Sequence, residues 1–256
     1  MKSVSIIIPC YNEENNLKRG VLDEVKSFLI KQKFSWEVLI CNDRSTDKSL
    51  DIIKKFVAKN PKFKVLDLPK SGKPGALWGG LKQAKNSIVL FTDMDQSTPI
   101  SEITKLLPHF EKGFDIVIGS RGGEREGNTF IRKLGSKIFS EVRNILLQTN
   151  IVDTQCGFKA MRTEVAKIIF PHLSVIKNIQ SGKGWRVTAY DVELLFIAEK
   201  LKYKIKEVPV IWKNEDTSLT KGDATTRYIK ESKQMAVEVW RIFTNNLKGS
   251  YAQIKK

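Results

Sequence analysis

Two aspartates, one residue apart, close an apolar segment of the chain. Residues 87–99 read SIVLFTDMDQSTP, so a short apolar run leads to Asp93 and Asp95 and stops at Pro99. Carboxylates at this spacing offer hard oxygen ligands to one small cation, and Mg²⁺ held in this way usually completes its shell with substrate phosphates. The same residues also fit a turn or a helix cap. The pair alone therefore leaves two interpretations open, a cation site and a simple turn.

Short apolar runs alternate with longer amphipathic runs around this segment, as in parallel strands joined by crossover helices. The predicted strands are residues 4–8, 37–42, 63–68, 88–92 and 115–119, and the predicted helices are residues 14–32, 46–59, 74–85 and 101–112. The second half predicts helices at 130–148, 163–170 and 190–201, a strand within 156–161 and a strand at 205–211. These elements predict an α/β fold with a doubly wound, mostly parallel sheet and flanking helices.

Polar residues follow the predicted strands, at the edge where an open parallel sheet binds its ligand. They are Pro9, Tyr11 and Glu13 after the first strand, Asp43 after the second, Asp93, Asp95 and Gln96 after the fourth, and Arg121 after the fifth. The chain as a whole carries 44 Lys and Arg against 28 Asp and Glu, a net charge of +16. This excess suits nucleic acid, an anionic membrane or a phosphorylated substrate as a partner. Carboxylates gathered within a basic protein are what a cation-bridged phosphate site requires.

Cysteine content and hydrophobic run lengths bear on the compartment. The three cysteines, Cys10, Cys41 and Cys156, are odd in number and lack metal-ligand spacing, which favours a reducing, cytoplasmic environment. The N-terminal apolar run is too short for a signal peptide, and no run of about 18 apolar residues could cross a bilayer. We therefore expect a protein that is not secreted, has no transmembrane helix, and contacts a membrane only peripherally.

Several ordered motifs carry a resemblance to a known family. They are IIIPCYNEENNL (6–17), LICNDRSTDKS (39–49), SGKPGAL (71–77), TDMDQSTP (92–99) and VIGSR (117–121). In this order they resemble the family-2 glycosyltransferases, inverting enzymes of the Rossmann-related GT-A fold that use nucleotide sugars. VDTQCGFKAM (152–161), YDVELLFIAEKL (190–201) and VPVIW (208–212) resemble its polyprenyl-phosphate branch, in particular the dolichyl-phosphate glucosyltransferases and mannosyltransferases. The resemblance implies a GT-A domain over residues 1–225.

The resemblance assigns a donor site and a metal site to residues of this chain. Pro9, Tyr11, Glu13 and Asp43 would bind the nucleoside of the sugar donor, and Lys73 would meet an anion at the start of a helix. Asp95 would bind Mg²⁺ or Mn²⁺, with Gln96 as a further candidate, and Asp93 would reach the ribose or the water shell of the metal. As alternatives, Pro9 ends a strand, Glu13 starts a helix, and Lys73 lies in a plain loop.

The resemblance also assigns an acceptor site. Arg121, Arg132 and Ser136 would bind the acceptor phosphate, because the forked guanidinium of Arg suits bidentate phosphate contacts. As the alternative, Arg132 belongs to the solvated face of the helix at 130–148. Asp191 falls where family members place a catalytic carboxylate: with a hydroxyl acceptor it would be the general base, and with a phosphate acceptor it would orient a basic side chain or the sugar.

The C-terminal segment, residues 226–256, has the pattern of a basic amphipathic helix and tail. Helical spacing gathers Tyr228, Ile229, Met235, Ala236, Val239, Trp240, Ile242, Phe243 and Leu247 in one arc, with Arg227, Lys230, Lys233, Arg241 and Lys248 outside it. Such a face can contact an anionic membrane surface, pack on its own domain or form a homo-oligomer. The sequence does not choose among these three.

The leading hypothesis is a metal-dependent hexosyltransferase. It would move a hexose, with glucose from UDP-glucose favoured, to a dolichyl or undecaprenyl phosphate at the inner face of a membrane. One alternative is a family-2 transferase that acts on a saccharide or another hydroxyl acceptor. Another is a basic nucleic-acid-binding module, which the dispersed basic residues and the lack of a recognition motif disfavour.

Overall fold

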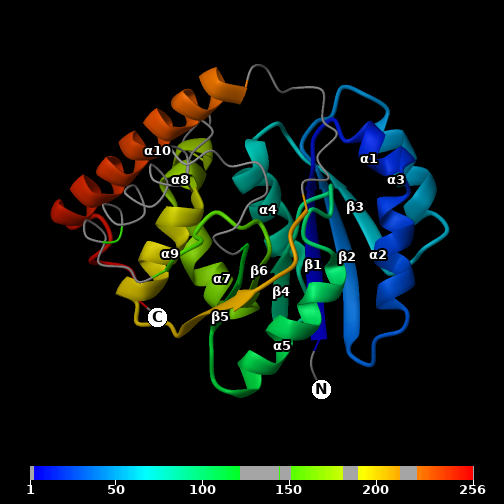
Figure 1. Ribbon diagram of the computed structural model, residues 1–256, viewed down its shortest axis with the longest axis horizontal. Coiled ribbons are helices and arrows are strands. Elements are labelled where there is room, and N and C mark those ends of the chain that lie inside the picture. Colours follow the sequence, from blue (N-terminus) through cyan, green and yellow to red (C-terminus); the bar gives the residue numbers. More distant parts are fainter. Residues whose placement is uncertain (1–2, 122–143, 145–150, 181–189, 214–223, 256) are drawn as a thin grey trace.

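The computed structural model describes residues 3–121, 144, 151–180, 190–213 and 224–255. Within these ranges a single seven-stranded sheet runs through the molecule in the order β3-β2-β1-β4-β6-β5-β7 (Figure 1). The strands are β1 (Ser3–Cys10), β2 (Ser35–Asn42), β3 (Phe63–Asp67), β4 (Ile88–Phe91), β5 (Ile116–Ser120), β6 (Lys159–Arg162) and β7 (Ile205–Pro209). All neighbours pair in parallel except β6, which is antiparallel to both β4 and β5. The predicted α/β fold with a mostly parallel sheet is confirmed.

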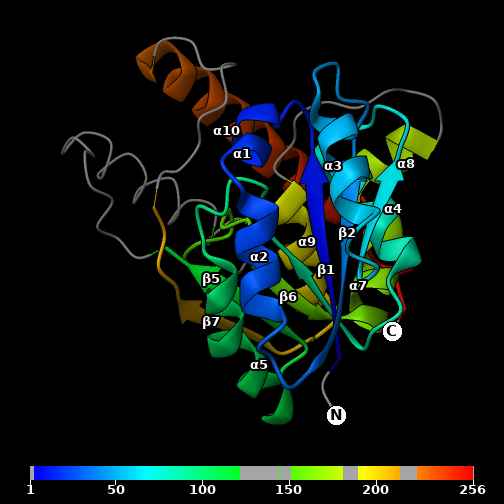
Figure 2. The same ribbon diagram turned by 90° about the vertical axis from the view of Figure 1, so that its right-hand side faces the viewer.

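Helices cover both faces of this sheet (Figures 1 and 2). They are α1 (Glu14–Lys18), α2 (Val21–Leu29), α3 (Ser49–Val57), α4 (Gly72–Gln83), α5 (Ile103–Glu111), α7 (Thr163–Ile169), α8 (Ser174–Gln180), α9 (Tyr190–Lys200) and α10 (Ala224–Leu247), with short 3-10 turns at Ile100–Glu102 and Phe170–His172. Successive side chains of a strand point to opposite faces of the sheet, so each strand contributes to two cores, one under each layer of helices. Ile7 joins the core beneath α4, α7 and α9, whereas Ile6 and Ile8 join the core beneath α2 and α5.

Local chemistry accounts for the differences from the predicted elements. The helix predicted over 14–32 is two helices, because Gly20 between them has a φ of 90°, a conformation that glycine adopts without steric cost. The segment predicted to hold a strand at 156–161 does so only from Lys159 onward, and α8 was not predicted. The helix predicted at 130–148 lies outside the described residues.

Helix α4 lies unusually close to the sheet. A Cβ atom built on Gly80 would stand 2.6 Å from Cγ2 of Ile7 and 2.7 Å from Sγ of Cys41, so only glycine fits at this crossing. The close approach holds α4 over β1 and β2 and fixes where its first turn, with Lys73, meets the ends of those strands. The position of α4 on the sheet therefore determines where Lys73 lies in the site.

The C-terminal helix packs along one edge of its apolar face and exposes the other. Val239 and Ile242 are buried in the same core as α9, which answers part of the question that the sequence left open. Trp240 and Leu247 were predicted on the same arc, yet they are 59% and 70% exposed. Arg241 was expected outside the arc, and its guanidinium donates to the buried carboxylate of Glu193, a contact that the sequence did not predict. None of the helices within the described ranges is long and apolar enough to cross a membrane.

Candidate active site

The candidate site lies where the strand order of the sheet reverses. Strands β1 and β4 are parallel neighbours, while the chain continues outward from β1 through β2 and β3 on the other side. In open α/β sheets, ligands bind beyond the carboxyl ends of the strands at such a switch point. The residues that follow β1, β2 and β4 here include most of the polar set that the sequence singled out.

A cavity of about 270 Å³ opens at this point. Its lining consists of Pro9, Cys10, Tyr11, Glu13, Asp43, Lys73, Ala76, Asp93, Met94 and Asp95. Seven of these residues were predicted for the donor or the metal, and four separate chain segments bring them together. The structure thus gathers the predicted donor-site residues in one place, while their roles remain predictions.

The first turn of α4 is already occupied by an anion from the chain itself. The backbone N–H groups of Ser71 and Gly72 donate to the carboxylate of Asp43 at 2.6 Å and 2.9 Å. A carboxylate is well placed there, because the first N–H groups of a helix have no partner within the helix. The sequence suggested these amides as a site for a substrate anion, but Asp43 fills it. The Lys73 ammonium is the group from this turn that reaches the cavity.

Lys73 and Asp93 form an ion pair within the cavity, with Nζ 2.6 Å from Oδ1. Burial opposes the charge on both groups, but their mutual attraction outweighs it, so the pKa of Asp93 is lowered and that of Lys73 is raised. Gly157 closes the other side of Asp93, since a Cβ atom there would overlap Oδ2 of the carboxylate. Asp93 is consequently held as an anion in one position.

Four carboxylates line the cavity; Asp43 is bound to the first turn of α4, and the other three are Glu13, Asp93 and Asp95. Burial, followed by the charges of Asp95 and Asp93, raises the pKa of Glu13 to about 7 against a hydrogen bond from Asn16. Such crowding of negative charge favours a bound cation. Among the described residues, no three His, Cys, Asp or Glu side chains are grouped as a complete metal site. That arrangement fits Mg²⁺ or Mn²⁺ held by one or two carboxylates whose remaining ligands come from substrate and water.

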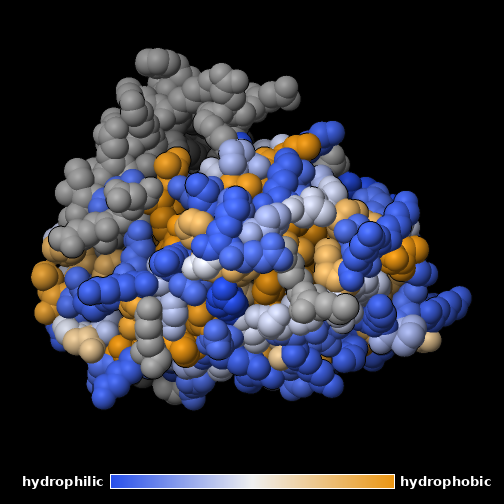
Figure 3. Space-filling model, turned by 90° about the horizontal axis from the view of Figure 1, so that it is seen from below, coloured by the Kyte–Doolittle hydropathy of each residue, from blue (hydrophilic) through white to orange (hydrophobic). Residues whose placement is uncertain are grey.

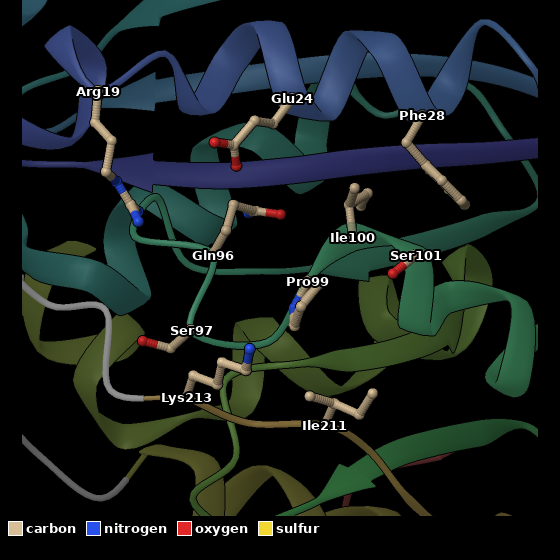
Figure 4. Close-up of a pocket in the computed structure, with 10 residues that line it drawn as sticks. All are labelled: Arg19, Glu24, Phe28, Gln96, Ser97, Pro99, Ile100, Ser101, Ile211 and Lys213. Carbon is tan, nitrogen blue, oxygen red and sulfur yellow. The ribbon is translucent and has the colours of Figure 1, made fainter.

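Gln96 faces a second cavity instead. This hollow of about 510 Å³ lies between α2 and the segment that follows β7, and Figure 4 shows Gln96, Arg19 and Lys213 around it. The amide nitrogen of Gln96 donates to the backbone oxygen of Asp93 at 2.8 Å, and its oxygen is buried without a hydrogen-bond partner. Gln96 therefore braces the Asp93–Asp95 turn, and it does not line the cavity that holds the two carboxylates.

On the predicted acceptor side, Arg121 is bound to Asp153. Its Nε and a terminal nitrogen donate to the two carboxylate oxygens at 2.8 Å and 2.7 Å. Burial by itself would raise the pKa of Asp153, but the hydrogen bonds and charge of Arg121 lower it to about 2. The sequence gave no signal for this partner. Arg132 and Ser136 lie outside the described residues.

Asp191 forms an ion pair with Lys159 that sequence reasoning missed. Asp191 lies in the first turn of α9, and its Oδ1 is 2.7 Å from Nζ of Lys159 on β6. The Lys159 side chain is only 2% exposed, and it also donates to the backbone oxygen of Cys156. A lysine within the apolar run CGFKAM was the available signal, because a buried lysine needs a countercharge. Burial raises the pKa of the Cys156 thiol, in keeping with a core position.

Comparison with known families identifies the class of protein. Residues 5–170 match Glycosyl transferase family 2, and the chain belongs to that family. Within it, the chain is related to dolichyl-phosphate beta-glucosyltransferases. The Dictyostelium discoideum protein of that name is 32% identical over 263 residues, which cover 96% of this chain and 75% of that protein. The Homo sapiens protein is 33% identical over 233 residues, which cover 82% and 67%.

Solved structures share the fold at lower identity. Glucosyl-3-phosphoglycerate synthase from Mycobacterium tuberculosis, in complex with Mn²⁺, UDP-glucose and glycerol 3-phosphate, matches with a TM-score of 0.63 and 17% identity over 95% of this chain and 80% of that one. A Pyrobaculum calidifontis mannosyltransferase in complex with GDP-Man and Mn²⁺ matches with a TM-score of 0.56 and 17% identity over 93% and 63%. Likeness at this identity shows the GT-A fold alone.

Proposed function

We propose that this glycosyltransferase moves glucose from UDP-glucose to a polyprenyl phosphate, of the dolichyl or undecaprenyl type, with inversion at the anomeric carbon. The observation that carries the proposal is the cavity at the switch point, which gathers Tyr11, Glu13, Lys73, Asp93 and Asp95. Similarity to the dolichyl-phosphate beta-glucosyltransferases over most of the chain supports this donor and this acceptor.

The reaction requires the protein mainly to align the acceptor phosphate with the sugar donor and to balance their negative charges. A phosphate oxygen of the acceptor attacks the anomeric carbon, the bond from that carbon to the diphosphate breaks, and its electron pair leaves on UDP. A phosphate monoester has a second pKa of about 6, so the nucleophile is already largely dianionic at neutral pH. The transfer then requires no proton acceptor.

Asp95 is the proposed ligand for Mg²⁺ or Mn²⁺, and Asp93 contacts the ribose or the water shell of the metal. When bound, the cation stabilises the charge that develops on the departing diphosphate. Lys73 stands beside Asp93 and adds a positive charge at the same wall of the cavity. Tyr11, with the Lys70 ammonium over its ring, forms an exposed face on which a flat base can stack.

We also propose that the exposed edge of α10 lies on an anionic membrane surface at the cytoplasmic side. Val237, Trp240 and Leu247 are 65%, 59% and 70% exposed and follow one another at helical spacing. These exposed apolar side chains suit a shallow contact with a membrane surface. On the face drawn in Figure 3, apolar atoms form small patches within a largely hydrophilic surface. On this proposal the GT-A domain covers residues 1–225, and residues 226–256 form the part that meets the lipid.

One assay tests the reaction. UDP release is measured with UDP-glucose and Mn²⁺ or Mg²⁺, with and without a short polyprenyl phosphate, and GDP-mannose replaces the donor in a parallel set. Lipid-dependent release from UDP-glucose that EDTA abolishes is the expected result. Turnover with saccharides but not with the lipid would instead support the hydroxyl-acceptor alternative, and turnover with GDP-mannose alone would overturn the donor.

A second assay tests the membrane contact. The full chain is floated with vesicles of phosphatidylcholine alone or with phosphatidylserine added, and Trp240→Glu is compared with Ile30→Glu, the same kind of change at a 62% exposed apolar residue that follows α2. Loss of flotation in Trp240→Glu alone is expected. Unchanged flotation in that variant would refute the contact, and a concentration-dependent dimer that Trp240→Glu dissolves would assign this edge to a homo-oligomer.

A further inference from the structure

Lys159 is the most deeply buried cation of the described site, and neither the motifs nor the comparisons give it a role. Its side chain enters from β6 and reaches the Asp191 carboxylate at the start of α9. This pair joins strand β6 to helix α9. At 2% exposure, Lys159 has no access to water that would compensate for a lost partner.

The surroundings of the pair carry both signs of charge. Lys73 and Arg121 also interact electrostatically with Asp191, and Asp93 and Asp153 interact with Lys159. The hydroxyl of Tyr190 shares a hydrogen bond with Asp191. Several cations thus interact with Asp191, and among the described residues Lys159 forms the ion pair with it.

The pair bears on which acceptors the site can use. If Asp191 were neutralised during transfer, the Lys159 ammonium would remain buried without the carboxylate in contact with it, and removing one partner of a buried ion pair is strongly unfavourable. A hydroxyl acceptor releases a proton that some base must take during transfer, whereas a phosphate dianion releases none. The ion pair is therefore compatible with a phosphate acceptor and disfavours transfer to a hydroxyl acceptor.

We propose that Lys159 is a positioning residue that holds Asp191 in an ion pair, and that this pair restricts the enzyme to acceptors that are already anionic. The proposal rests on the proposed function, since it names how that same site selects a phosphate. Asp191 then orients the acceptor side of the site through fixed charge and takes no proton in the reaction.

The first test uses the unaltered full chain and two acceptors of equal chain length, a polyprenyl phosphate and the matching polyprenol. With UDP-glucose and Mn²⁺, we expect transfer to the phosphate at a kcat/KM at least about 10²-fold above that for the alcohol, because a general base contributes about that much or more. Comparable transfer to both acceptors would overturn the proposal. Failure with the phosphate and turnover with another acceptor would instead overturn the proposed function.

The second test uses Lys159→Met, Asp191→Asn and the double variant. Lys159→Met strands a buried carboxylate beside two anionic substrates, so we expect a loss of about 10²-fold or more, mainly in kcat/KM for the acceptor. Asp191→Asn leaves the buried Lys159 ammonium without the carboxylate in contact with it and should also lose activity, so removing both charges in the double variant should recover activity above both single variants. Activity in the double variant no better than in either single variant would overturn the proposal. Lys159→Arg, which keeps the charge, should retain more activity than Lys159→Met, and equal loss in both would also count against it.

Discussion

Replacing Gly157 by alanine should displace the Asp93 carboxylate without unfolding the protein. The new methyl group would lie 2.2 Å from Oδ2 of Asp93 and 3.0 Å from its carboxyl carbon, closer than real Cβ contacts allow. Relief requires a shift of about 1 Å, because the side chain must regain ordinary packing contact. The 2.6 Å ion pair with Lys73 stands on the opposite side and resists that movement.

A displacement of this size sets the expected loss. Misplacing a group at a reacting centre by about 1 Å can cost about 10²-fold in rate, which corresponds to about 2.7 kcal/mol of transition-state stabilisation. Overpacking should lower the free energy of unfolding by only about 1 kcal/mol. We therefore expect kcat/KM for UDP-glucose to fall about a hundredfold, with a change in Tm of a few degrees at most.

The assay measures UDP release with polyprenyl phosphate and Mn²⁺, alongside thermal unfolding of the same preparations. Gly79→Ala is the matched control, because its Cβ would crowd the flexible end of Leu68 at 2.4 Å, outside the lining of the cavity. That variant should lose some stability and keep its kcat/KM. Wild-type kcat/KM in Gly157→Ala would refute the argument that Asp93 must stay where it is, and so would an equal loss in the control.

Three further predictions follow from the same geometry. Asp95→Asn should reduce UDP release at least about 10²-fold and raise the Mn²⁺ concentration for half-maximal activity, and an unchanged Mn²⁺ requirement would exclude Asp95 as a ligand. Arg241→Met should lower the free energy of unfolding, measured in urea, by about 2 to 3 kcal/mol. The carboxylate of Glu193 is fully buried, and without Arg241 its remaining hydrogen bonds among the described residues come from Ser174 and Tyr251. A change below about 0.5 kcal/mol would contradict this prediction. The pKa of Glu13 is raised to about 7 by burial, so its contribution to stability is present at low pH and is lost as the pH rises from about 4.5 to 7. In metal-free buffer, Glu13→Gln should reduce that fall, and a pH dependence identical to wild type would refute the burial argument.

Much of the fold could be predicted because its signals are local. The apolar runs of β1 and β2 have no polar face, which is typical of strands covered on both sides, and their carboxyl ends place Tyr11 and Asp43 at one edge. Asp93 and Asp95 follow β4, the parallel neighbour of β1, so their approach to Tyr11 and Glu13 could be argued from topology before any contact was known. For this part of the molecule, the apolar pattern of the strands and the position of their carboxyl ends in a parallel sheet predict the same site.

The parts that could not be predicted depend on partners far apart in the sequence. Asp43 looked like a nucleoside ligand, yet it binds the N–H groups of Ser71 and Gly72, 28 and 29 residues away. The requirement for glycine at position 157 arises only because β6 runs antiparallel beside β4 and brings that backbone against Asp93. Neither periodicity nor composition contains such information, because both describe neighbours along the chain.

The ion pairs of the site and the proposed bound cation would have different roles. Lys73, Arg121 and Lys159 each hold a carboxylate within 2.7 Å, from Asp93, Asp153 and Asp191. These three pairs are close to neutral as units, so they cannot by themselves offset a diphosphate and a phosphate dianion brought into contact. Their rigid geometry instead fixes where substrates can lie, since a paired side chain does not move to meet its ligand. On the proposed function, a cation bound at Asp95 would supply the compensating charge. The need for a bound cation would explain why several carboxylates line the cavity of a chain whose net charge is +16.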